Sequence, residues 1–189
     1  SSQKYHVVFN GRQIYQYDDI DLILGTTRKL NSSKTELIDV LYFTGHSEKG
    51  KFQFSKDKNI ESFKVIDKLV SKKCKSLIIS SCDFLKEEKD LDKKLIAAFN
   101  KSKSLKLLIT ISSGGPGLNS EDDYLLVGTI TNILFDNLKL FDIPSFGDVS
   151  SKIEKRLKGI FKDSFLSKAG IKILYKGKGK KNPEVINFR

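Results

Sequence analysis

The chain has 189 residues, of which 39% are hydrophobic and 30% are charged, proportions typical of one globular domain with an ordinary buried core. No stretch approaches the roughly 18 consecutive apolar residues of a membrane-spanning helix, and the first residues lack the pattern of a secretory signal. We therefore expect one domain over residues 1–189, without membrane contact. The absence of methionine indicates that this domain was excised from a longer chain.

The formal net charge of +11 fits either an acidic partner such as nucleic acid or a lysine-rich solvated surface. The lysines are scattered along the chain, and only residues 176–181 form a dense run. That run lacks the interleaved aromatic residues of a platform that binds single-stranded nucleic acid. A solvated loop is the favoured interpretation, and nucleic acid is not expected as a partner.

Apolar periodicity predicts strands and helices that alternate along the chain. The expected strands cover residues 5–11, 37–46, 76–82, 105–111 and 171–175. The expected helices cover residues 17–30, 59–73, 87–101, 121–138 and 148–161, the second with Asn59 as N-cap. A turn at 47–50, a hairpin arm at 51–54 and a closing edge segment at 182–188 complete the pattern. This order predicts an α/β domain of three layers with a mostly parallel central sheet.

Two of the predicted strands end at residues that can carry nucleophilic chemistry. Residues 37–46 end at Gly45 and His46, and residues 76–82 end at Cys82. A helical pattern separates the two strands, so they are expected to form a βαβ unit with parallel, neighbouring strands. His46 and Cys82 would then leave the sheet at its carboxyl edge, where open α/β sheets place their ligand crevice.

A cysteine needs help to act as a nucleophile. A free thiol with a pKa near 8.5 is only about 3% thiolate at pH 7. In enzymes a neighbouring imidazole usually accepts the thiol proton and so activates the sulfur. One of the two histidines and one of the two cysteines fall at matching strand ends, which favours a Cys82–His46 dyad. The alternative is that Cys82 is a small apolar residue beneath a loop and that His46 belongs to an ordinary turn.

The two cysteines are not expected to form a disulfide. On one strand, Cys74 and Cys82 would lie about 26 Å apart, far beyond disulfide reach. Reduced thiols and a cytoplasmic location follow, with Cys74 as a structural residue at the amino edge. His6 is expected at the opposite end of a strand from His46 and Cys82, so these residues do not make a zinc site. No metal or cofactor is expected.

The strand at residues 105–111 runs into a glycine-rich loop that contains Ser113 and Gly114. The loop lacks the spacing of known phosphate-binding motifs. It fits either close approach to an extended substrate backbone or a simple mobile turn. Asp122 and Asp123 open the next expected helix, where they would either stabilise the helix dipole or form a charged wall of the crevice.

The segments Phe43-Thr44-Gly45-His46 and Ile79-Ser80-Ser81-Cys82-Asp83 resemble the caspase-like (clan CD) cysteine peptidases, which include caspases, metacaspases and CHAT peptidases. Residues 111–117 are similar to the substrate-loop strand of caspases, and residues 182–186 to the last strand of metacaspases. The caspase Gln-Ala-Cys-Arg-Gly and metacaspase Asp-Ser-Cys patterns are absent. Fewer elements than in caspases precede the strand that carries the histidine.

The resemblance implies a cysteine endopeptidase that acts on protein or peptide substrates, under the control of regulatory domains or partner proteins. Cys82 would attack the scissile carbonyl, His46 would protonate the leaving amine, and backbone N–H groups at Gly45 and Cys82 would hold the oxyanion. The substrate would be bound by Ser80, Ser113, Gly114, Asp122 and Asp123.

The acidic residues of this set favour a basic residue before the cut bond. An acidic preference, with Arg28 as a basic contributor, and a preference for small or neutral residues are the alternatives. Two alternatives remain. One is a catalytically inactive caspase-like interaction or regulatory domain. The other, favoured less, is an α/β domain that binds nucleotides or nucleic acid.

Overall fold

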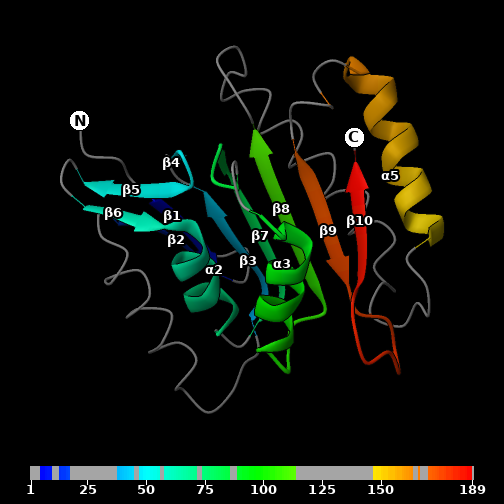
Figure 1. Cartoon of the computed structure of the whole chain (residues 1–189), viewed down its shortest axis with the longest axis horizontal. Helices are drawn as coiled ribbons and strands as arrows, with labels where there is room; N and C mark the ends of the chain where they lie inside the picture. The colour runs from blue at the N-terminus through cyan, green and yellow to red at the C-terminus, as the bar shows by residue number, and fades with distance from the viewer. Residues whose placement is uncertain are drawn as a thin grey trace.

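The computed structural model describes residues 5–9, 13–17, 38–44, 47–55, 58–71, 74–85, 89–113, 147–163, 166 and 170–188. These residues form a mixed α/β arrangement in which helices accompany a five-stranded sheet (Figure 1). None of the helices in the described ranges combines the length and apolar character that crossing a bilayer requires.

The five-stranded sheet has the order β10-β9-β8-β7-β3. Its strands are β3 (Ile38–Thr44), β7 (Cys74–Cys82), β8 (Leu107–Ser113), β9 (Ile171–Tyr175) and β10 (Glu184–Phe188). The β3–β7 and β7–β8 pairs are parallel, whereas β9 is antiparallel to both of its neighbours. The sheet is therefore mixed, and the expected parallel pairing of β3 with β7 is confirmed.

Strand β7 lies inside the sheet, between β3 and β8, and both of its faces are apolar along most of its length. Leu77 and Ile79 belong to the core cluster shared with the helices, and Ile78 is buried on the opposite face. A strand that is buried on both faces has a nearly continuous apolar sequence, as parallel sheets require.

Helices α2 (Ser62–Val70) and α3 (Leu91–Asn100) cover one face of the sheet (Figure 1). Each helix buries one apolar stripe: Val65, Ile66, Leu69 and Val70 in α2, and Leu95, Ala98 and Phe99 in α3.

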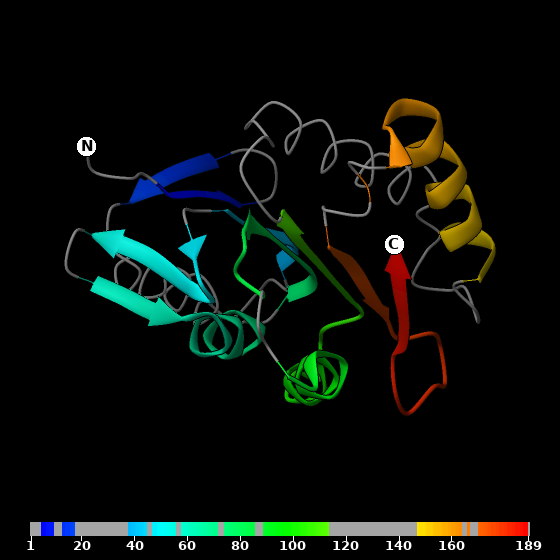
Figure 2. The same cartoon turned by 45° about the horizontal axis from the view of Figure 1, so that its top comes forward.

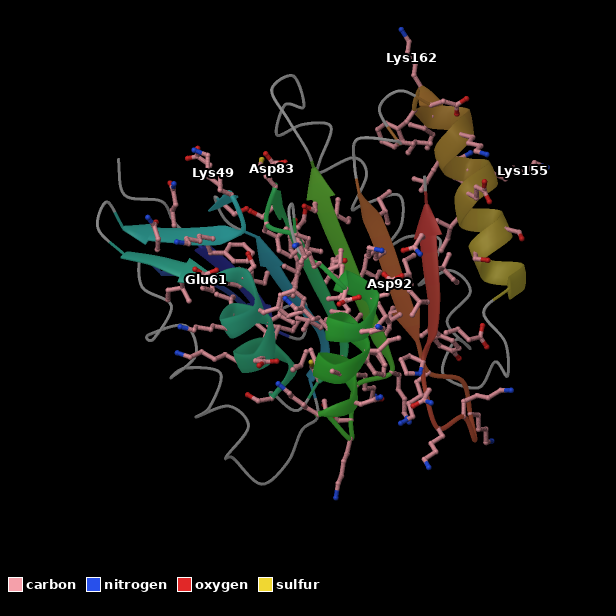
Figure 3. All side chains as sticks on the ribbon, in the orientation of Figure 1. Lys49, Glu61, Asp83, Asp92, Lys155 and Lys162 are labelled. Carbon is pink, nitrogen blue, oxygen red and sulfur yellow. The ribbon has the colours of Figure 1, made fainter. Side chains whose placement is uncertain are left out.

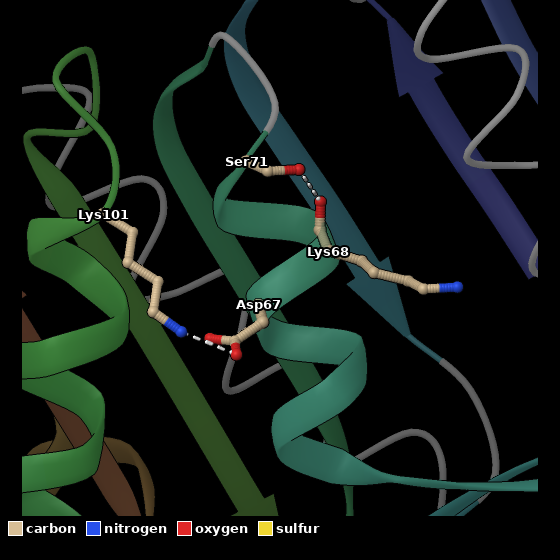
Figure 4. Close-up of polar contacts among 4 residues, drawn as sticks. All are labelled: Asp67, Lys68, Ser71 and Lys101. Atoms are coloured by element: carbon tan, nitrogen blue, oxygen red, sulfur yellow. Dashed lines mark hydrogen bonds and ion pairs between the residues drawn. The ribbon is translucent and has the colours of Figure 1, made fainter.

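One polar contact joins the two helices near their ends, and another lies at the end of α2 (Figure 4). Lys101 Nζ donates to Asp67 Oδ2 across 2.7 Å. Ser71 Oγ donates to the carbonyl of Lys68 at 2.6 Å and satisfies one of the free carbonyls at the end of α2.

Helix α5 (Gly147–Ile160) lies beside β10, at the edge of the sheet opposite β3 (Figures 1 and 2). It buries Ile153 and Leu157, while Glu154, Lys155, Arg156 and Lys158 are exposed. The prediction of a helix over 148–161 is thus confirmed to within one residue at each end.

Two small antiparallel sheets lie beyond β3 (Figure 2). Strands β1 (Tyr5–Phe9) and β2 (Gln13–Tyr17) form a hairpin, and β1 contacts β3. Strands β4 (Ser47–Glu48), β5 (Lys51–Ser55) and β6 (Lys58–Glu61) form the other sheet. The predicted hairpin arm at residues 51–54 is confirmed as β5.

Two sequence predictions were wrong at element boundaries. Tyr17, expected to begin a helix, is the last residue of β2, because residues 13–17 pair with β1. Asn59 is not an N-cap: it pairs with Gln53 in the β5–β6 hairpin, and α2 begins at Ser62. Residues 18–30 of the expected first helix, and the whole expected helix at 121–138, lie outside the described residues.

The first residue of helix α2 is held by hydrogen bonds to the turn between β4 and β5. Both the N–H and the hydroxyl of Ser62 donate to the carbonyl of Gly50, at 3.0 and 2.9 Å. The helix ends at Val70, and β7 begins already at Cys74, two residues before the predicted strand start.

Candidate functional site

The candidate site lies at the carboxyl ends of the three parallel strands, β3, β7 and β8. Thr44 of β3 pairs with Ser80 of β7, and Cys82 pairs with Ser113 of β8. Cys82 is exposed, whereas Ser80 and Ser81 just before it are only 2% and 4% exposed. The thiol is thus the group at the end of β7 that solvent and a substrate can reach.

Ser47 joins the segment after β3 to the end of β7. Its hydroxyl lies 2.5 Å from the Ser81 hydroxyl and also donates to the carbonyl of Cys82. Ser47 is only 2% exposed, and it directly follows His46 in the chain. A buried hydroxyl with two partners holds the backbone of Cys82 against the start of β4.

The β4–β5 hairpin adds a second connection to the same strand end. Its two-residue turn, Lys49 and Gly50, has positive φ at both positions, 49° and 75°, as a type I′ turn requires. This turn directs the Gly50 N–H to the carbonyl of Asp83, at 3.3 Å. Figure 3 shows Lys49 and Asp83 together at this end of the sheet.

The chain turns sharply directly after Cys82. Asp83 has φ 45°, in the left-handed region, which costs a residue other than glycine about 1 kcal/mol. The turn returns Phe84 and Leu85 to the core, where they are 0% and 6% exposed, and the Leu85 N–H donates to Ser112 Oγ at 3.3 Å. Cys82 therefore occupies the tip of a strand-to-turn corner that is anchored on both sides.

Three aromatic side chains pack against one another under this corner: Phe43, Phe52 and Phe84. We call them the aromatic floor. The Phe43 and Phe52 rings meet edge to face at a centroid distance of 5.3 Å, and Phe52 and Phe84 lie at the same distance. All three rings are at most 1% exposed. They come from β3, from β5 and from the turn after Cys82, so one cluster fixes all three segments relative to each other.

Several of the predicted site residues lie outside what the structure describes. These are Gly45, His46, Gly114, Asp122 and Asp123, together with Arg28. Ser113 is described only as the backbone partner of Cys82. Of the predicted set, the structure therefore brings Ser80, Cys82 and the backbone of Ser113 together at one edge, with Ser80 buried beneath the exposed thiol.

Ser47, Ser81, Gly50 and Asp83 were not predicted as site residues. The sequence marks Ser47 only by its position after His46, and residues 47–50 were expected to form a plain turn. In the described part of the chain, no three histidine, cysteine or acidic side chains are grouped closely enough to hold a metal ion.

Cys74, the first residue of β7, differs chemically from Cys82. Burial raises the pKa of its thiol from 9.0 to about 12. Cys74 is 0% exposed within the core cluster, as expected for a structural residue at the amino edge. The two thiols of β7 therefore occupy opposite ends of one strand and opposite environments.

Burial of the Cys74 thiol lowers the free energy of unfolding at alkaline pH. Above about pH 9 the unfolded chain loses the Cys74 proton while the folded chain keeps it, so the free energy of unfolding falls as pH rises toward 12. Between pH 9 and 10.5 we expect the free energy of unfolding of the wild type to fall by about 1.5 kcal/mol more than that of Cys74→Ala or Cys74→Val. Urea unfolding at the two pH values measures the difference. Parallel pH curves for all three proteins would mean that the thiol is not buried.

Comparisons with family models, with curated proteins and with solved structures gave no match to this chain.

Proposed function

We propose that the chain is a caspase-like cysteine endopeptidase domain with Cys82 as nucleophile and His46 as its acid–base partner. The observation that carries the proposal is the exposed Cys82 thiol at the carboxyl end of β7, next to β3, the strand that precedes His46 in sequence. The hydrogen bond from the Ser47 hydroxyl to the Cys82 carbonyl adds support, because Ser47 is the next residue after His46 in the sequence.

The fold proposed is the three-layer caspase-like one. Its support is the parallel order β3-β7-β8, the helices α2 and α3 on one face, and α5 beside β10 (Figures 1 and 2). Open sheets of this kind carry ligands beyond the carboxyl ends of their strands, which is where Cys82 lies.

The proposed reaction is hydrolysis of a peptide bond in two steps. The imidazole of His46 takes the thiol proton, and the sulfur of Cys82 attacks the scissile carbonyl carbon, whose π electrons move to oxygen. Backbone N–H groups at Gly45 and Cys82 stabilise this oxyanion. The C–N bond then breaks as the His46 imidazolium protonates the amine, and water hydrolyses the thioester to release the acid and regenerate the thiol.

The substrate proposed is a protein or peptide segment with a basic residue before the cut bond. Ser113, Gly114, Asp122 and Asp123 would bind it, the two carboxylates pairing with the basic side chain. Ser80, expected from the sequence to belong to this set, is only 2% exposed and is left out of it. Profiling a peptide library with the active protein tests this preference. Cleavage mostly after Asp or Glu would contradict it and direct attention to Arg28.

Covalent labelling tests the proposal itself. We expect iodoacetamide to modify Cys82 in the folded protein and to leave Cys74 unmodified, as mapped by mass spectrometry. A peptidyl chloromethyl ketone that ends in L-lysine should label Cys82 at least ~10-fold faster than its D-lysine counterpart, because only a formed substrate site distinguishes the two. Equal rates would favour a catalytically inactive caspase-like domain.

A further inference from the structure

Lys49 stands at the tip of the β4–β5 hairpin, and hydrogen bonds fix this turn on two sides. The Gly50 N–H donates to the carbonyl of Asp83 at 3.3 Å, and the Gly50 carbonyl accepts two hydrogen bonds from Ser62, at 3.0 and 2.9 Å. Asp83 directly follows Cys82 in the chain. Lys49 and Cys82 are therefore the chain neighbours of the two residues that the first bond joins. Figure 3 shows Lys49 and Asp83 at the same end of the sheet.

The backbone conformation of this turn does not favour a lysine. The first position of a type I′ turn has positive φ, which asparagine, aspartate and glycine adopt most easily. Lys49 occupies that position with φ 49°. Residues held in such sparsely populated conformations concentrate at functional sites. A lysine at this position is therefore explained by its side chain rather than by the turn.

The ammonium group of Lys49 is accessible to a ligand. The Lys49 side chain is 79% exposed and pairs with Glu48, its chain neighbour, at 3.6 Å, and the Glu48 side chain is 59% exposed. An ion pair this exposed adds little stability because water and salt screen it. A carboxylate of a bound peptide can therefore replace Glu48 as the partner of Lys49.

The neighbouring charges are arranged differently. Lys51, the first residue of β5, pairs with Glu61 of β6 at 3.3 Å. One carboxylate oxygen of Asp83, Oδ1, is buried. Lys49 is thus an exposed cation whose backbone is tied to the residue after Cys82, and Lys51 is a second exposed cation of the same hairpin that can serve as its control.

The hairpin lies on the leaving-group side of the proposed nucleophile. Cys82 ends β7, which has β8 on one side and β3 on the other. The residues proposed to bind the segment before the cut bond begin at the end of β8, whereas β4 follows β3 and contacts β7. Ser47, the first residue of β4, directly follows His46, which would protonate the leaving amine. A peptide that crosses Cys82 from β8 to β3 therefore carries its residues after the cut bond toward this hairpin.

We propose that Lys49 binds a carboxylate on the part of the substrate that follows the cut bond, an inference that rests on the proposed peptidase function. An extended peptide advances about 3.3 Å per residue, so the flexible four-carbon stem of a lysine can reach the first or second residue after the bond. The carboxylate is either an Asp or Glu side chain or a free carboxyl terminus at the second residue. The substrate class is thus a peptide with a basic residue before the cut bond and a negative charge just after it.

The test compares pairs of quenched fluorescent peptides that have lysine before the cut bond. One set carries Glu or Gln at the first or second position after the bond, and the other set ends at the second position with a free carboxylate or an amide. In at least one pair, the wild type should cleave the charged member with about 3- to 5-fold higher kcat/KM, as an exposed ion pair allows. The pair that shows the preference identifies the source of the carboxylate.

The kinetic form of the preference is also expected. The difference should appear in KM rather than in kcat, because the ion pair is the same in the ground state and in the transition state. It should fade as the KCl concentration rises from roughly 0.05 to 0.5 M, since both groups are exposed.

Variants of Lys49 separate its charge from its place in the turn. Lys49→Gln and Lys49→Asn should cleave both members of each pair equally well, whereas Lys49→Arg should keep the preference. Lys49→Asn should also be at least as resistant to urea as the wild type, because asparagine adopts positive φ more easily. Lys51→Gln is the matched control: it removes the same charge two residues away and should keep the preference of the wild type.

The outcomes distinguish this inference from the proposed function. Hydrolysis without a preference for the charged peptide would overturn the role of Lys49 and leave the peptidase assignment standing. Equal loss of preference in Lys49→Gln and Lys51→Gln would do the same, in favour of an effect of net charge. No hydrolysis of any peptide would overturn both.

Discussion

Replacing Cys82 with alanine is expected to lower kcat/KM for peptide hydrolysis by roughly 10⁴-fold or more, because the proposed nucleophile is lost. The thiol is exposed, so the free energy of unfolding should change by no more than about 0.5 kcal/mol. Steady-state hydrolysis of a fluorogenic peptide with lysine before the cut bond measures the first quantity. Urea unfolding measures the second.

Cys74→Ala is the matched control, since it removes the other thiol of the same strand. Its turnover should stay within a few-fold of wild type, because Cys74 lies in the core at the far end of β7. A loss as large as that of Cys82→Ala would contradict the assignment. Retained hydrolysis in Cys82→Ala would exclude Cys82 as the nucleophile.

Phe52→Ala is expected to lower the free energy of unfolding by about 3 to 5 kcal/mol, the range typical of a large aromatic residue deleted from a core. Phe52 is 0% exposed, contacts both Phe43 and Phe84, and pairs with Ser47 across the β4–β5 hairpin. Losing it leaves a cavity beneath all three segments that meet at Cys82. Equilibrium unfolding in urea measures the effect.

Phe63→Ala makes the same chemical change at a partly buried position on α2. It should cost clearly less, because less apolar area returns to water and a smaller cavity remains. If the two variants lose equal stability, the aromatic floor does not have the special role assigned to it.

The strands that position Cys82 could be predicted because their sequences are strongly apolar. The runs that became β3 and β7 form a parallel pair, and β9 matches its predicted bounds of 171–175. By contrast, residues 58–61 are polar except for Ile60, and their strand β6 exists through its pairing with β5. Such pairing is tertiary information that a local pattern does not contain.

The contacts around the site could not be predicted for a related reason. Ser47 and Ser81 stand 34 residues apart in the sequence, and no pattern links the two hydroxyls. In the sequence, only residues 176–181 looked densely charged, and they were interpreted as a solvated loop.

The order of strands in the main sheet also bears on how the chain folds. From β3 to β10, each new strand joins the sheet directly beside the preceding one, with no return to an earlier position. With sequential addition, each strand has to close only the connection to its immediate predecessor, which lowers the entropic cost relative to an order that returns to an earlier strand. On a ribosome, β3 and β7 can pair before β9 has been synthesised. The corner that holds Cys82 can thus be in place while the C-terminal strands are still emerging.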